Sequence, residues 1–351
     1  MSTEYTENAM PVPEPEVSEE ETIRTRQHYE SIKKLRFVLM FFVCIKLVGF
    51  PTPFGGIVQT LCGFATLAFY IISGYLVLWE DAERPARIRR SIKRSAIGFL
   101  AISVVYFIIN FFLYRAAGTN IFLSFKEPRL WFSFLVLNNW PFEFGSAVWF
   151  VQSLLYAYII IYFLDKFKLL RFDFVIFAVC LVIAILTGEL GALTHLVVPG
   201  NFLTRALPYI LLGGLIARKR SAFFMVRSWK YALMAIAGVL LMLGEIFLLA
   251  RFNKVGYYGH LIGMPMLAVP LCVHAFRDPS NGFRSPFMRG IRRSQISLFY
   301  YLCQPVSLCL ALAASAIREG LLSYISGFFG ILTFIICFLI VVVLRMVRND
   351  D

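Results

Sequence analysis

Ten apolar stretches, each close to the length that a helix needs to cross a bilayer, occupy most of the 351-residue chain. They are residues 36–50, 57–79, 96–114, 146–164, 173–188, 202–217, 229–250, 257–276, 295–315 and 323–344. A transmembrane helix needs about 20 predominantly apolar residues, or slightly fewer, and a soluble domain has no reason to repeat that length ten times. The pattern predicts an all-α polytopic membrane protein with ten transmembrane helices.

The charge distribution agrees with this prediction and orients the chain. Charged residues make up 16% of the sequence, below the roughly 25% of a typical soluble domain. With the N-terminus in the cytoplasm, 26 of the 34 Lys and Arg residues fall on the inner side, seven on the outer side, and Lys46 within a span. This bias is the positive-inside rule, so both termini are predicted to be cytoplasmic. The net charge of +13 therefore reflects topology rather than a nucleic-acid partner, and attraction to membrane lipid or an anionic cofactor stays open.

The two ends of the chain are predicted to lie outside the membrane domain. Residues 1–21 contain seven Glu and three Pro but no Lys or Arg, a composition that buries too little apolar surface to offset the entropy of ordering. We expect a disordered acidic cytoplasmic tail and no cleaved signal peptide, because no basic start precedes an apolar run. Residues 22–35 are predicted to form an amphipathic interfacial helix, ahead of a membrane domain over 36–345 and a cytoplasmic tail over 346–351.

Cysteine and histidine give no sign of a metal site. The seven cysteines all fall in predicted spans without a Cys-x-x-Cys pair, and the four histidines are scattered along the chain. We interpret the cysteines as small apolar packing residues and expect no metal. The catalytic motifs of soluble enzymes are absent as well.

A few polar, glycine and proline residues occur within the predicted spans, where contact with lipid alone does not explain them. The second span ends in residues 73–75, Ser-Gly-Tyr, the fourth opens near Trp149, and the sixth begins with Arg205 and Pro208 in its first turns. Each has a purely structural alternative. The Ser-Gly pair lets a neighbouring helix approach, Trp149 anchors at the outer interface, and Pro208 kinks its helix.

Taken in order, these segments resemble the acyltransferase-3 family, the bacterial ten-span membrane O-acyltransferases. The resemblance rests on Arg36 at the start of the first span, Phe69 to Tyr75, Trp149-Phe150, Leu207 to Gly214, and Ser297 to Pro305. It covers residues 25–345, and the ordered set is more specific than any one motif.

The resemblance implies an enzyme of the bacterial cytoplasmic membrane. Such a protein takes an acyl group, usually acetyl, from cytoplasmic acyl-coenzyme A and delivers it to a hydroxyl of an envelope or extracellular glycan or glycolipid. Acetyl-coenzyme A is a polyanion, so basic residues beside the second span are natural docking groups. The expected cofactor-binding residues are Arg36, Arg89, Arg90, Lys93 and Arg94. The expected substrate-binding or tunnel-lining residues are Ser73, Tyr75, Trp149, Arg205 and Tyr209.

The sequence departs from the family at its catalytic histidine. The family carries a His eleven residues after the first-span Arg, which places both on nearly one helix face, but here that position is Leu47. Lys46 is adjacent, and a lysine within a span is costly. We therefore expect Arg36 and Lys46 to be the catalytic residues, with Lys46 acting as a base or acyl acceptor. The alternatives are an interfacial, topology-setting Arg36 and a Lys46 that snorkels or pairs with an acid such as Glu245.

Two classes of function are consistent with this sequence. The first is a membrane acyltransferase. The second is a catalytically silent relative that acts as a transporter, sensor or assembly partner for envelope glycans, since a fold does not fix a function. A transporter reading predicts internal repeats with paired broken helices, and no clear internal symmetry is seen. Without an extra domain after residue 345, we expect any acceptor-specific partner protein to be a separate chain.

Overall fold

The computed structural model describes residues 19–50, 54–79, 82–142, 144–145, 147–186, 201–251, 261–278, 282–283, 285, 288, 291, 293–317 and 328–349. Every regular element among these residues is a helix, which confirms the predicted all-α fold. The α-helices are α1 (Glu19–Val48), α2 (Gly55–Leu61), α3 (Phe64–Val77), α4 (Arg84–Ala116), α5 (Pro128–Leu135), α6 (Val148–Lys166), α7 (Asp173–Ile185), α9 (Phe202–Arg205), α10 (Leu207–Arg218), α11 (Arg220–Met225), α12 (Ser228–Arg251), α13 (Gly263–Arg277), α15 (Arg293–Ile317) and α17 (Phe329–Asn349). Two short 3-10 helices are η1 (Ile121–Lys126) and η2 (Leu169–Phe172).

Six helical segments of the described chain are long and apolar enough to cross a membrane. They are Gly55–Val77, Arg84–Ala116, Val148–Lys166, Ser228–Leu248, Gln295–Ala314 and Phe329–Val347. These segments correspond to six of the ten predicted spans and indicate a multi-pass membrane protein. The other four predicted stretches overlap α1, α7, the pair α9 and α10, and α13. That these also cross the bilayer, and that both termini face the cytoplasm, stay predictions.

The first helix is longer than the sequence led us to expect. α1 runs without interruption from Glu19 to Val48, so it passes through residues 21–22 and 35–36, where we placed boundaries between segments. The acidic tail lies outside the described residues up to position 18. At the other end, α17 continues to Asn349 and so passes residue 345.

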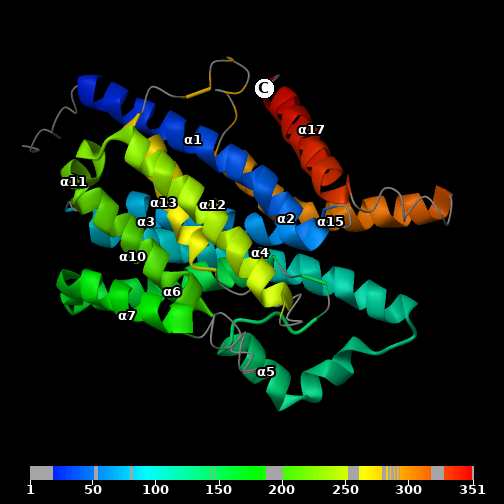
Figure 1. Cartoon of the computed structure of the whole chain (residues 1–351). Helices are drawn as coiled ribbons and strands as arrows, with labels where there is room; N and C mark the ends of the chain where they lie inside the picture. The colour runs from blue at the N-terminus through cyan, green and yellow to red at the C-terminus, as the bar shows by residue number, and fades with distance from the viewer. Residues whose placement is uncertain are drawn as a thin grey trace, which may run out of the picture.

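The core is organised around α3. Twelve of the 14 residues of α3 are buried, because this helix packs against α1, α4, α10 and α13. Figure 1 shows α1 and α17 converging near α15, and α6, α7 and α10 side by side at the opposite face of the bundle. α4, in contrast, buries only Ile88, Ile102, Tyr106 and Asn110, so most of its surface is available to lipid.

Glycines bring α3 and α10 into backbone contact. A Cβ added at Gly74 would lie 1.9 Å from the backbone oxygen of Ile210, and one at Gly213 would lie 2.1 Å from that of Ile71. Only a residue without a side chain fits at such a crossing. The Ser73-Gly74 pair and the Gly-Gly pair of the sixth stretch are thus two halves of one helix contact.

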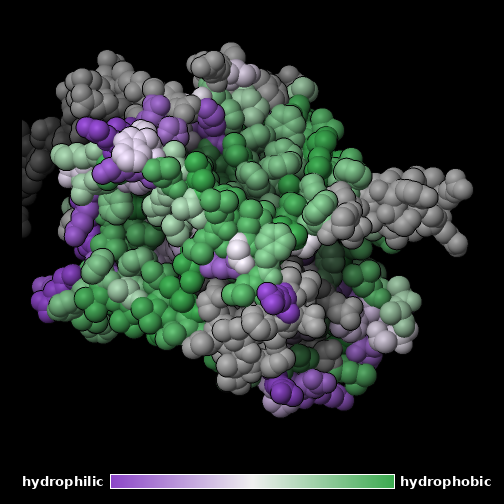
Figure 2. All heavy atoms as spheres, viewed as in Figure 1, coloured by the Kyte–Doolittle hydropathy of each residue, from purple (hydrophilic) through white to green (hydrophobic). Residues whose placement is uncertain are grey.

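The outer surface has the apolar character of a membrane protein. Large side chains of α12 and α4 are exposed, among them Leu240, Phe247 and Phe112. Figure 2 shows hydrophobic residues across the middle of the molecule, with hydrophilic residues gathered at the left edge, over α11, and at the bottom, beside α5.

Candidate functional site

A cavity of about 760 Å³ lies between α1, α3, α4, α6 and α15. We call it the arginine cavity. It is lined by Arg36, Met40, Phe69, Ser73, Leu76, Val77, Glu83, Arg87, Arg90, Ser91, Arg94, Ser95, Phe150, Val151, Leu154, Tyr158, Ser297, Tyr300 and Tyr301.

The polar wall of the cavity is one face of α4. Arg87, Arg90 and Arg94 are three or four residues apart, and this spacing places them in a row on a helix. Arg36 faces them from α1, with its guanidinium carbon 5.9 Å from the centre of the Phe69 ring. Arg94 is exposed and has no ion pair within the described part of the chain. The cavity therefore concentrates positive charge at one end.

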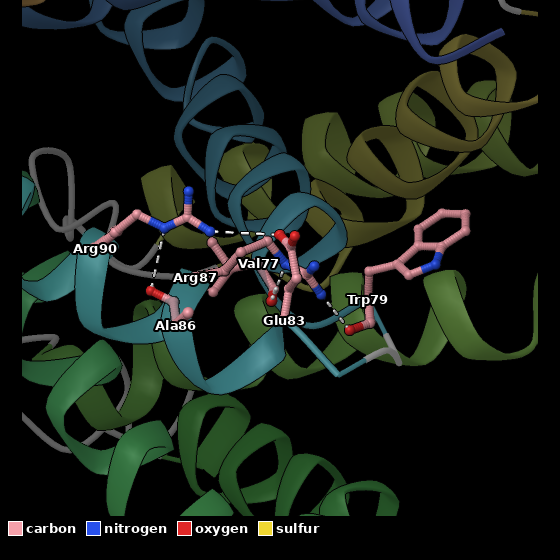
Figure 3. A network of polar contacts seen from close by, with 6 residues as sticks. All are labelled: Val77, Trp79, Glu83, Ala86, Arg87 and Arg90. Atoms are coloured by element: carbon pink, nitrogen blue, oxygen red, sulfur yellow. Dashed lines mark hydrogen bonds and ion pairs between the residues drawn. The ribbon is translucent and has the colours of Figure 1, made fainter. Parts of the chain in front are cut away.

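Two of these arginines are held in place by carbonyl groups. Arg87 donates hydrogen bonds from Nη2 to the carbonyl of Trp79 (2.5 Å) and from Nε to that of Val77 (3.3 Å), at the C-terminal end of α3. Arg90 donates to the carbonyl of Ala86 at 3.4 Å and lies 3.5 Å from the Glu83 carboxylate. Figure 3 shows this network between the start of α4 and the end of α3. A cation at a helix C-terminus also interacts favourably with the helix dipole, so the arginine wall is anchored to the buried helix α3.

The structure divides the predicted basic residues into two groups. Arg36, Arg90 and Arg94 line the cavity, whereas Arg89 and Lys93 are exposed on α4 and are not part of its lining. Arg87 lines the cavity but was not among the predicted residues. The signal was available, because positions 87, 90 and 94 share a helix face that 89 and 93 do not.

Of the predicted substrate residues, Ser73 lines the arginine cavity. Tyr75 instead stacks on Phe276 of α13, with ring centroids 3.8 Å apart and planes at 12°. Tyr209 is fully buried near the α3–α10 crossing and is not part of the cavity lining. Both tyrosines therefore belong to the packed core of the bundle. Tyr158 and Ser297, which the sequence did not single out as site residues, do line the cavity.

A second polar cluster gathers the remaining predicted residues. The Lys46 amine donates a hydrogen bond to Thr66 Oγ1 at 3.2 Å and lies 5.8 Å from the centre of the Trp149 ring. The Arg205 guanidinium lies 5.6 Å from the same ring. Lys46, Trp149 and Arg205, which are far apart in sequence, thus surround one indole, an arrangement that stabilises cations within an apolar region. We call these residues with Thr66 the lysine cluster.

The alternative pairing of Lys46 with Glu245 is not what the structure shows. The Glu245 carboxylate accepts hydrogen bonds from the backbone N–H groups of Ile262 (2.9 Å) and Gly263 (3.4 Å), at the start of α13. Among the described residues, Lys46 forms no ion pair. Glu245 is explained as a cap of α13.

Aromatic rings lie between the arginine cavity and the lysine cluster. Arg36 and Met40 of α1 line the cavity, and Lys46 lies about 9 Å beyond Met40 along the axis of the same helix. Phe150, the residue after Trp149, faces the cavity instead. Its ring stacks on Tyr70 at 4.8 Å and lies 4.9 Å from Tyr300.

The late segment that resembles the family has a structural role here. The Gln304 side chain accepts a hydrogen bond from the backbone N–H of Ala147 at 3.1 Å, and Tyr300 donates one to the Ala147 carbonyl at 2.8 Å. α15 thus fixes the start of α6. Leu47, at the place of the missing histidine, packs against the hydrophobic core. In the described part of the chain, no group of three or more His, Cys, Asp or Glu is placed to hold a metal ion.

Comparison with known proteins gives one match. A family model described as an acyltransferase domain matches residues 29–344, which is most of the chain. The match includes every residue of the arginine cavity and of the lysine cluster. No curated protein and no solved structure matches.

Proposed function

Because the chain belongs to the acyltransferase-3 family of membrane acyltransferases, we propose that it takes an acyl group, acetyl in the first instance, from cytoplasmic acyl-coenzyme A. The acceptor in this proposal is a hydroxyl of an envelope or extracellular glycan or glycolipid. The proposal includes a bacterial cytoplasmic membrane with ten crossings and both termini inside. It leaves room for a separate partner protein that presents the acceptor.

The observation that carries the proposal is the arginine cavity. Four guanidinium groups from two helices line it, three of them in a row on α4 and Arg36 on α1, and the rest of the lining includes apolar and aromatic side chains. Guanidinium groups bind phosphate oxygens in a bidentate way, and coenzyme A carries its phosphates at one end and its thioester at the other. The residues present therefore fit this acyl donor with its phosphates near Arg87, Arg90 and Arg94. The acyl end then points into the protein, where the absence of water protects a thioester.

Arg36 is placed between the two ends of the donor. It lies across the cavity from the α4 arginines and above the Phe69 ring. A cation here holds the donor in register and stabilises the negative charge that forms on the thioester oxygen during attack. We propose this role for Arg36.

We propose that the lysine cluster receives the acceptor. In this mechanism the thioester carbonyl and the acceptor hydroxyl meet where the two regions adjoin, beside Trp149 and Phe150. The neutral Lys46 amine takes the proton of the hydroxyl as the hydroxyl oxygen attacks the thioester carbonyl. The carbon–sulfur bond breaks, and the protonated Lys46 returns that proton to the thiolate, which leaves as the thiol of coenzyme A. Trp149 and Arg205 offer an apolar face and a hydrogen-bond donor beside Lys46, a combination suited to a sugar ring.

A second candidate, the catalytically silent relative, is favoured by Leu47 and Gln304. Leu47, at the place of the family's first-span histidine, packs against the core, and Gln304 in the late segment anchors α6, so both residues serve structure here. In this case the protein acts as a transporter, sensor or assembly partner for envelope glycans. Donor binding is then retained without transfer.

The test is transfer from labelled acetyl-coenzyme A by the purified protein in lipid vesicles. Transfer by the unmodified protein that is lost in both Arg36→Ala and Lys46→Met supports the enzyme. Arg89→Ala, which removes an exposed arginine outside the cavity, is the matched control and should retain transfer. Retained activity in Lys46→Met places the base elsewhere. Donor binding without transfer, with transfer gained in Leu47→His, identifies the silent relative.

A further inference from the structure

The apolar end of the arginine cavity is built from large side chains of four helices. They are Met40 of α1, Phe69 of α3, Phe150 of α6 and Tyr300 of α15. Each has at most 9% of its surface exposed. On α1 the polar residue Arg36 lies one turn away from Met40, and on α3 Ser73 lies one turn away from Phe69, so the same order from polar to apolar runs along two walls. We call these four residues the cavity floor.

The floor is closely packed. The Phe150 ring is in contact with every other aromatic member, at 4.9 Å from Tyr300 and 6.3 Å from Phe69 between ring centroids. The fully buried Tyr70 also stacks on the Phe150 ring, at 4.8 Å between ring centroids. Tyr300 is fixed by its hydrogen bond to the Ala147 carbonyl. Interiors packed in this way resist added volume.

The two ends of the cavity impose a direction on its ligand. In the proposed donor site the α4 arginines hold the phosphates at the polar end, so any carbon added to the acyl group would extend toward the floor. Because the phosphates cannot retreat without losing charge-assisted hydrogen bonds, the extra carbons must displace packed rings. The floor therefore discriminates between acyl groups by length.

We propose that the floor is the acyl-length gauge of this protein and that Phe150 sets the limit. Phe150 is the member to alter, because its ring contacts both Tyr70 and Tyr300 and makes no hydrogen bond. Replacing Tyr300 would instead release the start of α6, and replacing Phe69 would remove the ring beneath Arg36. The inference rests on the proposed donor site.

The experiment measures binding, so that it does not depend on turnover. Acetonyl-coenzyme A and 2-oxooctyl-coenzyme A, in which a methylene separates sulfur from carbonyl, are titrated into the unmodified protein and Phe150→Ala in the same vesicles. The unmodified protein should bind the short analogue at least about tenfold more tightly, the range that a few excluded methylenes produce. Phe150→Ala should remove or reverse that ratio by opening space at the floor.

Two further variants complete the test. Leu154→Ala enlarges the same cavity one turn nearer its polar end on α6, and it should leave the ratio of the two affinities unchanged. If Phe150→Ala does not fold, Phe150→Leu is used, and a smaller change in the same direction is expected.

The outcomes are distinct. Equal binding of both analogues by the unmodified protein, or an unchanged ratio in the Phe150 variants, overturns the gauge while the donor site stands. Failure of the unmodified protein to bind either analogue or coenzyme A itself overturns the donor site, and the gauge with it.

Discussion

The contact between α3 and α10 predicts the effect of a single methyl group. In Gly74→Ala the new Cβ would lie 1.9 Å from the Ile210 oxygen, whereas ordinary contact begins at 3.4 Å. The two backbones must therefore separate by the difference, roughly 1.5 Å. Overpacking of this kind costs about 1–3 kcal/mol and sometimes more. Backbone lies on both sides of the contact and no flexible side chain can move away, so we expect the upper end of that range.

The measurement is thermal unfolding of the purified protein in detergent, followed by tryptophan fluorescence and size-exclusion chromatography. At roughly 2–4 °C per kcal/mol for a domain of 150–250 residues, Gly74→Ala should lower the unfolding midpoint by about 5 °C or more. Gly244→Ala on α12 is the matched control, because nothing lies within 4 Å of its added Cβ. That variant should be unchanged or slightly stabilised, since alanine is the better helix former. Equal midpoints for the two variants would refute the close crossing.

Two further predictions concern the basic end of α4. Arg94→Gln should weaken coenzyme A binding about tenfold, because one charge-assisted hydrogen bond contributes roughly 1.5–3 kcal/mol. Lys93→Gln, one residue away and outside the cavity, should leave the affinity unchanged. Isothermal titration at two salt concentrations checks this, and an equal loss of affinity in both variants would contradict the assignment of the cavity face. Asp165→Asn should destabilise the protein by about 1–3 kcal/mol, because it removes the partner of half-buried Arg84, 2.8 Å away. The double variant Arg84→Met with Asp165→Leu should recover most of the thermal stability, and a double variant no more stable than the single one would show that the ion pair has no such role.

The all-helical fold and the six long apolar spans followed from the length and composition of the apolar stretches, because the thickness and apolarity of a bilayer set both. The site followed less completely. Helical spacing alone separates Arg87, Arg90 and Arg94 from Arg89 and Lys93, whereas the predicted set included Arg89 and Lys93 and omitted Arg87. The family resemblance, which the comparison confirms, directed attention to Arg36 and to the vacant position 47.

Other features depend on contacts between distant segments and were beyond the sequence. Tyr75 stacks on a ring 201 positions later in the chain, so nothing local distinguishes it from a tunnel residue. The meeting of Lys46, Trp149 and Arg205 likewise arises from three different helices or their ends. Gln304 is not recognisable as an anchor of α6 from the sequence, because its partner Ala147 is 157 positions away in the chain.

Trp149 and Phe150 are consecutive residues, and Trp149 lies in the lysine cluster while Phe150 lines the arginine cavity. Their rings are 6.2 Å apart and nearly perpendicular, and each forms part of a different proposed binding region. A ligand that displaces one ring also changes the surroundings of the other. Thermodynamic linkage then requires reciprocity: by whatever factor the donor alters acceptor affinity, the acceptor alters donor affinity equally. The first turn of α6 would make this membrane protein a two-ligand system in which neither affinity can be tuned alone.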